Sequence, residues 1–274
     1  MIIGKVPVSA DVSIRSVRKN NGVCLDGLTI MEEGDNIAPT FYLQNYYERY
    51  RNGADLAALA GEILWRNEQN SLHQIDVDAL TSYEAVKSRL CIRLVNYDMN
   101  AVLVQDLPHL LFLDLAVLFY YKVDGAIVPD AACLIQKEQL ADWGISLKDL
   151  AAAAFASAIL TEPPRIASMG GSPEMYIITN ASGLFGASVI TYPEIGQVLA
   201  ERFGEDMILI PSSIHELIAV PKRMIKKVEE LECLIQEVNA QEVAPEEVLS
   251  SHPYVLLHDT GEIRSCREEA GRSY

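Results

Sequence analysis

Short apolar runs, turn signals and helical repeats alternate along the chain, and their order predicts the fold class. Apolar and polar positions alternate over residues 12–18, and an apolar run returns over 23–31. Between them stands Asn21-Gly22, a dipeptide typical of tight two-residue hairpins. Residues 40–53 then repeat apolar and aromatic positions at helical spacing. The first segment therefore predicts a hairpin followed by a helix.

Three further segments follow the same plan of hairpin and helix. They begin with apolar runs at residues 110–121, 175–179 and 207–211. The first of these is expected to turn at Asp124-Gly125. Hairpins that alternate with helices differ from strand–helix–strand crossovers. The pattern therefore predicts the α+β class, with antiparallel sheets made from repeated hairpin–helix (ββα) units.

Proline and glycine mark the expected domain boundary. The stretch "TEPPRIASMGGSPE" combines three prolines with two glycines, which is typical of a linker. We therefore expect an N-terminal α+β domain over 1–160 and a linker over 161–173. A C-terminal ββαββα domain is expected over 174–264, and a polar tail over 265–274.

A long amphipathic helix is predicted near the C-terminus, over residues 222–239. Its apolar positions follow steps of four and three, which is the spacing of a coiled-coil seam: Met224, Val228, Leu231, Ile235 and Val238. The seam covers about two heptads, which is too short for an independent coiled coil. We expect it to pack on the sheet of its own domain, with a homodimer interface as the alternative.

Composition narrows the class of protein. The chain has 274 residues, half of them hydrophobic, and a net charge of −16. A surface this negative disfavours binding to nucleic-acid backbones and to anionic membranes. The five cysteines are scattered and form no C-x-x-C pair, which fits free thiols in a reducing compartment. The apolar run 110–121 is too short to span a bilayer, so we expect a cytoplasmic protein.

The stretch "SSIHE" at residues 212–216 concentrates reactive residue types. Ser213 and Glu216 have the spacing of a capping box, which favours a hairpin loop held by its own side chains. The alternative is a hydrolase-like site in which His215 carries a proton. In a continuous strand His215 and Glu216 would point to opposite faces and could not act together.

Other candidate residues are fewer. Asp114 interrupts an apolar run, which indicates either a buried carboxylate with a structural partner or a catalytic group. Tyr42, Tyr46 and Tyr47 form either a binding face or the wet side of a core helix. No metal-ligand spacing, phosphate loop or cofactor motif is found. We therefore expect no metal and no cofactor.

Several longer phrases carry a resemblance to a known family. They are "VRKNNGVCLDGLTI", "NIAPTFYLQNYYERY", "LPHLLFLDLAVLFYY" and "ILIPSSIHELIAVP". Together they resemble an uncharacterised bacterial family, a domain of unknown function often encoded near mobile elements. The resemblance implies no activity, cofactor or catalytic residue. It does imply an extra helix before residue 12, so a shortened N-terminus is expected.

These observations favour a soluble, non-catalytic binding or interaction protein with an unknown protein partner. We expect it to be a monomer or a weak homodimer that contacts neither nucleic acid nor membrane directly. Two alternatives remain open. One is an enzyme, hydrolase-like, with a site around His215, Ser213 and Asp114. The other is an acidic inhibitor that imitates nucleic acid, which requires the negative charge to form an ordered stripe.

Overall fold

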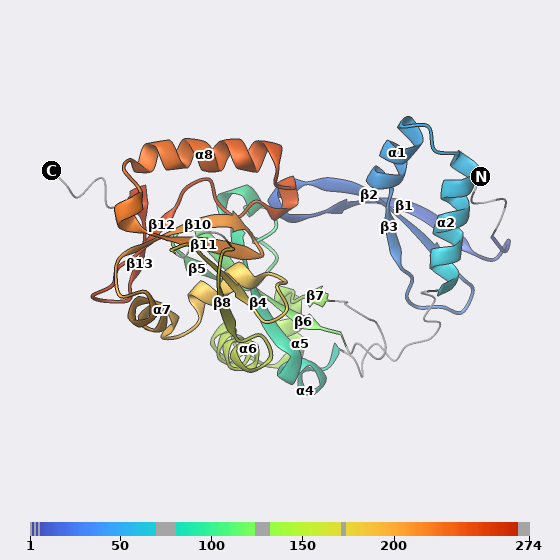
Figure 1. Ribbon diagram of the computed structural model, residues 1–274. Coiled ribbons are helices and arrows are strands. Elements are labelled where there is room, and N and C mark those ends of the chain that lie inside the picture. Colours follow the sequence, from blue (N-terminus) through green and yellow to red (C-terminus); the bar gives the residue numbers. More distant parts are fainter. Residues whose placement is uncertain are drawn as a thin grey trace. The chain divides into compact units, whose positions relative to one another are not determined.

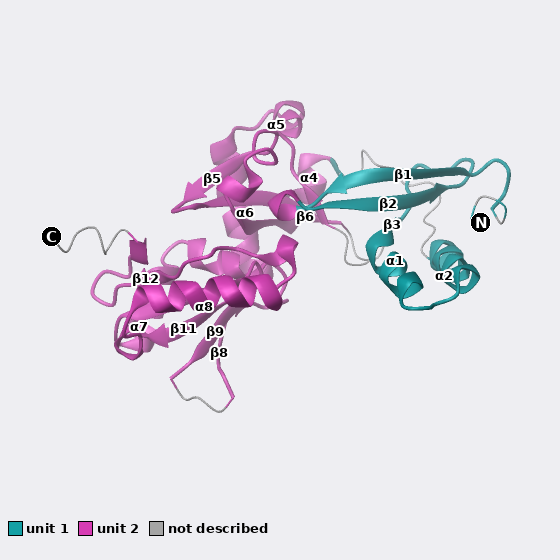
Figure 2. Ribbon diagram, turned by 90° about the horizontal axis from the view of Figure 1, so that it is seen from above, with its two compact units in different colours: residues 1–19, 23–81, 124–129 teal, residues 20–22, 82–123, 130–274 magenta. Residues whose placement is uncertain are grey.

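The computed structural model describes residues 2, 4, 6–69, 81–123, 132–170 and 174–267. It divides the chain into two compact units, which Figure 2 colours separately. Unit 1 comprises Met1–Lys19, Val23–Thr81 and Asp124–Pro129, and unit 2 comprises the remainder. Every sheet in the described residues is antiparallel, and helices pack against the sheets. The predicted α+β class is therefore confirmed.

The described residues of unit 1 form a three-stranded sheet and two helices. In order these are β1 (Asp11–Arg18), β2 (Cys24–Met31), β3 (Thr40–Tyr42), α1 (Leu43–Arg51) and α2 (Leu56–Gln69). The strands and helices enclose a small core of buried side chains: Leu28, Ile30, Phe41 and Ile63. The predicted helical spacing after residue 40 thus yields a short strand first and then α1.

The turn between β1 and β2 is longer than the predicted two-residue hairpin. The Lys19 amide donates to the Val23 carbonyl oxygen at 2.7 Å, so the turn proper is Asn20–Gly22. Asn21 and Gly22 have φ values of 56° and 71°. Asparagine and glycine tolerate this left-handed region best. The Asn-Gly signal therefore locates the reversal correctly, but one more residue takes part in it.

The part of unit 2 that the structure describes holds two sheets. The six-stranded sheet has the order β13-β12-β10-β11-β9-β8, with these bounds: β8 (Pro164–Ser168), β9 (Tyr176–Asn180), β10 (Met207–Ser213), β11 (Glu216–Pro221), β12 (Tyr254–Leu256) and β13 (Ile263–Ser265). In the four-stranded sheet the central strand β6 pairs with all the others: β4 (Leu90–Asn96), β5 (His109–Phe112), β6 (Leu115–Lys122) and β7 (Ala132–Leu134).

The helices of unit 2 cover these sheets (Figure 1). They are α4 (Tyr83–Val86), α5 (Lys137–Trp143), α6 (Leu147–Thr161), α7 (Ile195–Phe203) and α8 (Val228–Gln241). Ser146 is the N-cap of α6, and Asp149 completes a capping box with it. No single helix in the described residues is long and apolar enough to cross a membrane. The pair α5–α6 reaches that length only with a 95° bend.

Central strands of unit 2 are buried on both faces, which explains their continuous apolar sequences. In β10 the side chains of Met207 and Leu209 join the main core, together with residues of the four-stranded sheet. Ile208 points to the opposite face and packs under α8. Because successive strand side chains alternate between faces, both sets must be apolar.

The predicted repetition of ββα units is not confirmed in the described residues. The run 110–121 is itself a hairpin of β5 and β6 rather than one strand. After β9 the chain enters a 3-10 helix, Gly186–Thr191, and makes no return strand. The expected turn at Asp124-Gly125 lies outside the described residues. Within the stretch proposed as a linker, Pro164–Ser168 forms β8, an edge strand of unit 2.

The seam of the predicted C-terminal helix is partly buried. Leu231 and Ile235 pack against Ile208, Val220 and Val255 of the six-stranded sheet. Figure 1 shows α8 running across this face. The two ends of the seam differ from the prediction, because Met224 precedes α8 and is 46% exposed, and Val238 is 42% exposed.

Candidate functional site

Asp114 lies in the turn between β5 and β6, not inside a strand. Phe112 pairs with Leu115 across the ladder, so Leu113 and Asp114 form a two-residue turn. Leu113 has a φ of 56°, and the Asp114 carbonyl oxygen accepts the Tyr97 amide at 3.1 Å. The carboxylate that interrupts the apolar run therefore marks a reversal of the chain. This places it at the end of the four-stranded sheet.

Three side chains from the segment that leads into β12 surround the Asp114 carboxylate. Tyr254 donates its hydroxyl to Oδ1 at 2.9 Å. Nε2 of His252 lies 3.4 Å from Oδ2. Ser250 Oγ donates to the same oxygen at 3.4 Å and lies 3.3 Å from Nδ1 of His252. A carboxylate, an imidazole and two hydroxyls thus form one hydrogen-bonded group.

The protonation states in this group follow from burial and its hydrogen bonds. Burial acts to raise the pKa of Asp114, but the hydrogen bond and charge of His252 and the Tyr254 hydroxyl together hold it below its ordinary value. Burial, reinforced by the Asp114 charge, raises the pKa of Tyr254. Asp114 is therefore an anion at neutral pH, and Tyr254 keeps the proton that it donates.

The group borders a cavity of about 520 Å³ in unit 2, here called the Asp114–His252 pocket. Its polar lining includes Asn96, Asp98, Asp114, Gln236, Asn239 and His252. Arg267 also lines it, and its Nε bonds Glu232 Oε1 at 3.0 Å. Ser250 is fully buried. The pocket therefore offers carboxylate and amide oxygens to a ligand, and Ser251 also lines it, whereas the buried Ser250 does not.

The low pKa of Asp114 predicts a pH-dependent share of stability. Its ordinary pKa of 3.8 applies to the unfolded chain, and the folded value is lower. Stability from the charged form is therefore complete above about pH 5 and is lost as the pH falls through the folded pKa. We expect Asp114→Asn to lower the free energy of unfolding at pH 7, and this deficit to shrink towards pH 2–3 in urea titrations. A deficit that grows on acidification would contradict the assignment.

The structure gives His215 partners within unit 2. It stands in the tight turn between β10 and β11, where Ser213 pairs with Glu216 across the ladder. Nδ1 accepts the Phe185 amide at 3.1 Å, and the ring stacks on Phe185 at 5.6 Å. Nε2 lies 3.6 Å from Glu247 Oε1. The imidazole thus joins three segments of unit 2.

The serines beside His215 hold the turn. Ser213 Oγ accepts the His215 amide at 3.0 Å, and Ser212 Oγ donates to Glu216 Oε1 at 3.4 Å. The predicted capping box between Ser213 and Glu216 is absent, because these two residues pair as strand neighbours. The described contacts of Asp114 run to Ser250, His252 and Tyr254 rather than to this turn.

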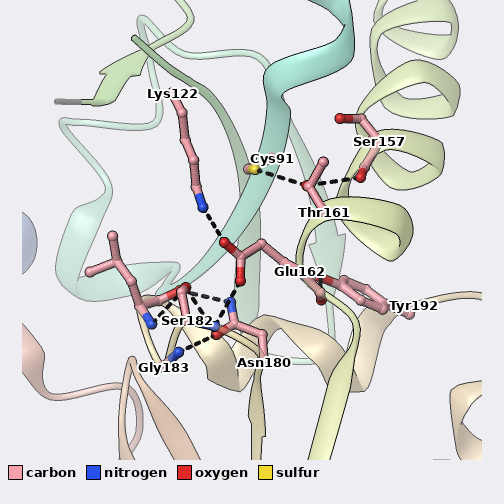
Figure 3. A network of polar contacts seen from close by, with 10 residues as sticks. Cys91, Lys122, Ser157, Thr161, Glu162, Asn180, Ser182, Gly183 and Tyr192 are labelled. Carbon is pink, nitrogen blue, oxygen red and sulfur yellow. Dashed lines mark hydrogen bonds and ion pairs between the residues drawn. The ribbon is translucent and has the colours of Figure 1, made fainter. Parts of the chain in front are cut away.

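A second polar cluster centres on Glu162, which is 3% exposed (Figure 3). Its Oε1 accepts Lys122 Nζ, and its Oε2 accepts the Ser182 amide at 3.0 Å. The Tyr192 hydroxyl donates to the Glu162 carbonyl oxygen at 3.1 Å. The carboxylate is enclosed by its own partners, so this cluster joins α6 to the neighbouring strands and offers no group to a ligand.

The tyrosines proposed as a binding face have unequal surroundings in unit 1. Tyr46 packs against the core, and the Lys19 ammonium lies 3.9 Å from the Tyr42 ring centroid. Tyr47 is 56% exposed. Among the described residues, no group of three or more histidine, cysteine or acidic side chains is placed to hold a metal ion.

The sequence pattern does not single out Ser250, His252 and Tyr254 as a site. Their spacing along the chain is the one feature that indicates it. In "SSHPYVL" these three residues stand at alternate positions. Alternate residues of an extended segment point to one face. That spacing places a hydroxyl, an imidazole and a phenol together, but only the folded chain shows that Asp114 meets them.

Comparison with known proteins places the chain in a family. A family of unknown function, DUF5688, matches residues 1–172 and 170–256, which is most of the chain. No curated protein and no solved structure matches it. The resemblance to an uncharacterised family is therefore confirmed: the chain belongs to DUF5688, a family of unknown function.

Proposed function

We propose that this protein is a binding protein without a catalytic centre, and that unit 2 receives a cationic group in the Asp114–His252 pocket. The observation that carries the proposal is the chemistry of the lining. Asp98 and Asp114 face the pocket beside the side chains of Asn96, Gln236 and Asn239. Amide oxygens and carboxylates accept hydrogen bonds from ammonium and guanidinium groups.

The charge of the whole protein supports the same class of ligand. The net charge of −16 attracts a basic partner over long range and repels anionic ones. Within the pocket, Arg267 already bonds Glu232 and therefore leaves the Asp98 and Asp114 carboxylates in excess. A basic side chain of a partner protein is the ligand that best complements this surface.

The proposal predicts that the pocket distinguishes arginine from its neutral isostere. N-acetyl-arginine amide should shift the NMR signals of the Asn96, Gln236 and Asn239 side-chain amides, with a Kd on the order of millimolar for one charged contact. N-acetyl-citrulline amide has nearly the same shape without the charge. Equal effects of both compounds, or none from either, would overturn the proposal.

Two matched substitutions locate the site. Asp98→Asn removes one carboxylate from the rim of the pocket and should weaken arginine amide binding about threefold to fivefold. Asp142→Asn makes the same change on α5, where the side chain is exposed, and should leave the affinity unchanged. A similar loss in both variants would point to non-specific attraction by the net charge.

A hydrolase is the second candidate, because polar atoms of Ser250, His252 and Asp114 lie within 3.4 Å of one another in each pair. The buried hydroxyl of Ser250 argues against a nucleophile, but His252 could still activate water. Hydrolysis of p-nitrophenyl acetate that Asp114→Asn abolishes would favour this candidate. Rates equal to buffer in both proteins agree with the binding proposal.

A further inference from the structure

Helix α8 presents one polar stripe to two cavities. Glu229, Glu232, Gln236 and Asn239 follow steps of three and four, so they lie on one side of the helix. Gln236 and Asn239 line the Asp114–His252 pocket. Glu229 and Glu232 line a second cavity of about 620 Å³. The two cavities therefore open along the same side of α8.

The second cavity, here called the basic pocket, is lined by more cations than carboxylates. The cations are Lys222, Lys226, Lys227 and Arg267, and the carboxylates are the two of α8. Three of the cations have carboxylate partners: Lys222 lies 3.6 Å from Asp206, Lys227 lies 2.7 Å from Glu230, and Arg267 bonds Glu232. Lys226 forms no ion pair with the part of the chain that the structure describes. Lys226 is therefore the cation of this lining that a ligand carboxylate can pair with.

Arg267 joins the two pockets. Its side chain lines both of them, and its bond to Glu232 fixes it beside the middle of the polar stripe. The floor of the basic pocket is apolar, formed by Ile208 and Ile225. A ligand that lies along α8 thus meets cations at one end, apolar side chains near them, and the Asp114 carboxylate at the other end.

We propose that this side of α8 binds an extended peptide segment of a partner protein that carries both a basic and an acidic residue. The inference rests on the proposed function for the basic residue and adds a carboxylate held in the basic pocket. From Glu229 to Asn239 the helix rises about 15 Å at 1.5 Å per residue. An extended peptide covers that length in about four to five residues. The charges of the ligand should therefore stand four or five positions apart.

Synthetic peptides test the spacing and the charges. Acetylated and amidated Arg-Gly-Ser-Gly-Glu and its reverse, Glu-Gly-Ser-Gly-Arg, carry charges four positions apart. At least one of them should bind about threefold to fivefold more tightly than its counterpart with Gln for Glu, at low ionic strength. The dipeptide Arg-Glu, with adjacent charges, should gain nothing over Arg-Gln. Isothermal titration calorimetry or NMR titration measures the three pairs of affinities.

A variant of the protein then assigns the acidic end. Lys226→Gln should abolish the difference in affinity between the Glu peptide and the Gln peptide. It should leave the affinity of the Gln peptide unchanged. Lys148→Gln makes the same change at an exposed position of α6 and should keep the advantage. The non-additivity of the peptide and protein substitutions measures the contact directly.

The outcomes separate this inference from the proposed function. If Glu and Gln peptides bind with equal affinity while N-acetyl-arginine amide still binds, the proposal of a ligand with both charges is wrong. The proposal that the Asp114–His252 pocket binds a cation then stands. If neither the peptides nor arginine amide binds, both are wrong. An advantage of the Glu peptide that survives Lys226→Gln would also overturn the assignment of its carboxylate to the basic pocket.

Discussion

Replacing Lys122 by methionine is expected to lower the free energy of unfolding by about 2–4 kcal/mol. Glu162 is 3% exposed, and its carboxylate has two partners, the Lys122 ammonium and the Ser182 amide. Without the Lys122 ammonium, the buried Glu162 carboxylate keeps a single hydrogen-bond donor, the Ser182 amide. Because the Lys122 side chain is itself 36% exposed, the expected cost falls in the lower part of the range for broken buried pairs.

Urea unfolding at pH 7 measures this change, and two further variants control it. Lys148→Met removes an exposed lysine of α6 and should change stability by at most about 0.5 kcal/mol. Lys122→Met combined with Glu162→Gln should recover much of the loss, because a neutral amide oxygen still accepts the Ser182 amide. A double variant no more stable than the single one would show that the loss comes from packing and not from charge.

Burial on both faces explains which parts of the fold the sequence predicts. The apolar run around Met207 is a strand because it packs on the main core and on α8 at once. Strand β6 of the run 110–121 is likewise buried on both faces, in the main core and in a smaller cluster with Val95 and Val104, yet the run contains a reversal at Leu113. Leucine is not typical of a left-handed turn position, so Asp114 is the one local signal that separates β5 from β6. Tertiary pairing of the two strands decides the turn.

The sequence predicts one residue of the candidate site, Asp114, but not the partners that surround it. A carboxylate in an apolar run predicts a buried or functional Asp114, and the structure gives it three partners. Its hydrogen bond to Tyr254, however, joins residues 140 positions apart. Local spacing drew attention to Ser213 and His215 instead, whose contacts hold a turn. Spacing along a chain identifies groups on one element, but it carries no information about which elements meet.

The apolar seam of α8 leads to the remaining prediction, that Leu231→Ala destabilises the folded protein by about 2–4 kcal/mol. Leu231 is 9% exposed and packs against Ile208, Val220 and Val255 of the six-stranded sheet. Truncation removes apolar contact and leaves a cavity that rigid strands fill poorly. Leu234→Ala is the matched control, since Leu234 is 54% exposed on the same helix and its loss should cost at most about 0.5 kcal/mol.

Concentration dependence distinguishes this packing from a homodimer seam. If the seam is covered by the protein's own sheet, the urea midpoint of the wild type should not change over a hundredfold range of protein concentration, and Leu231→Ala should lower it equally throughout that range. A seam shared between two copies would give a midpoint that rises with concentration, because mass action stabilises the associated state. Leu231→Ala would then yield a stably folded monomer, and the packing of Leu231 between α8 and the six-stranded sheet would need another explanation.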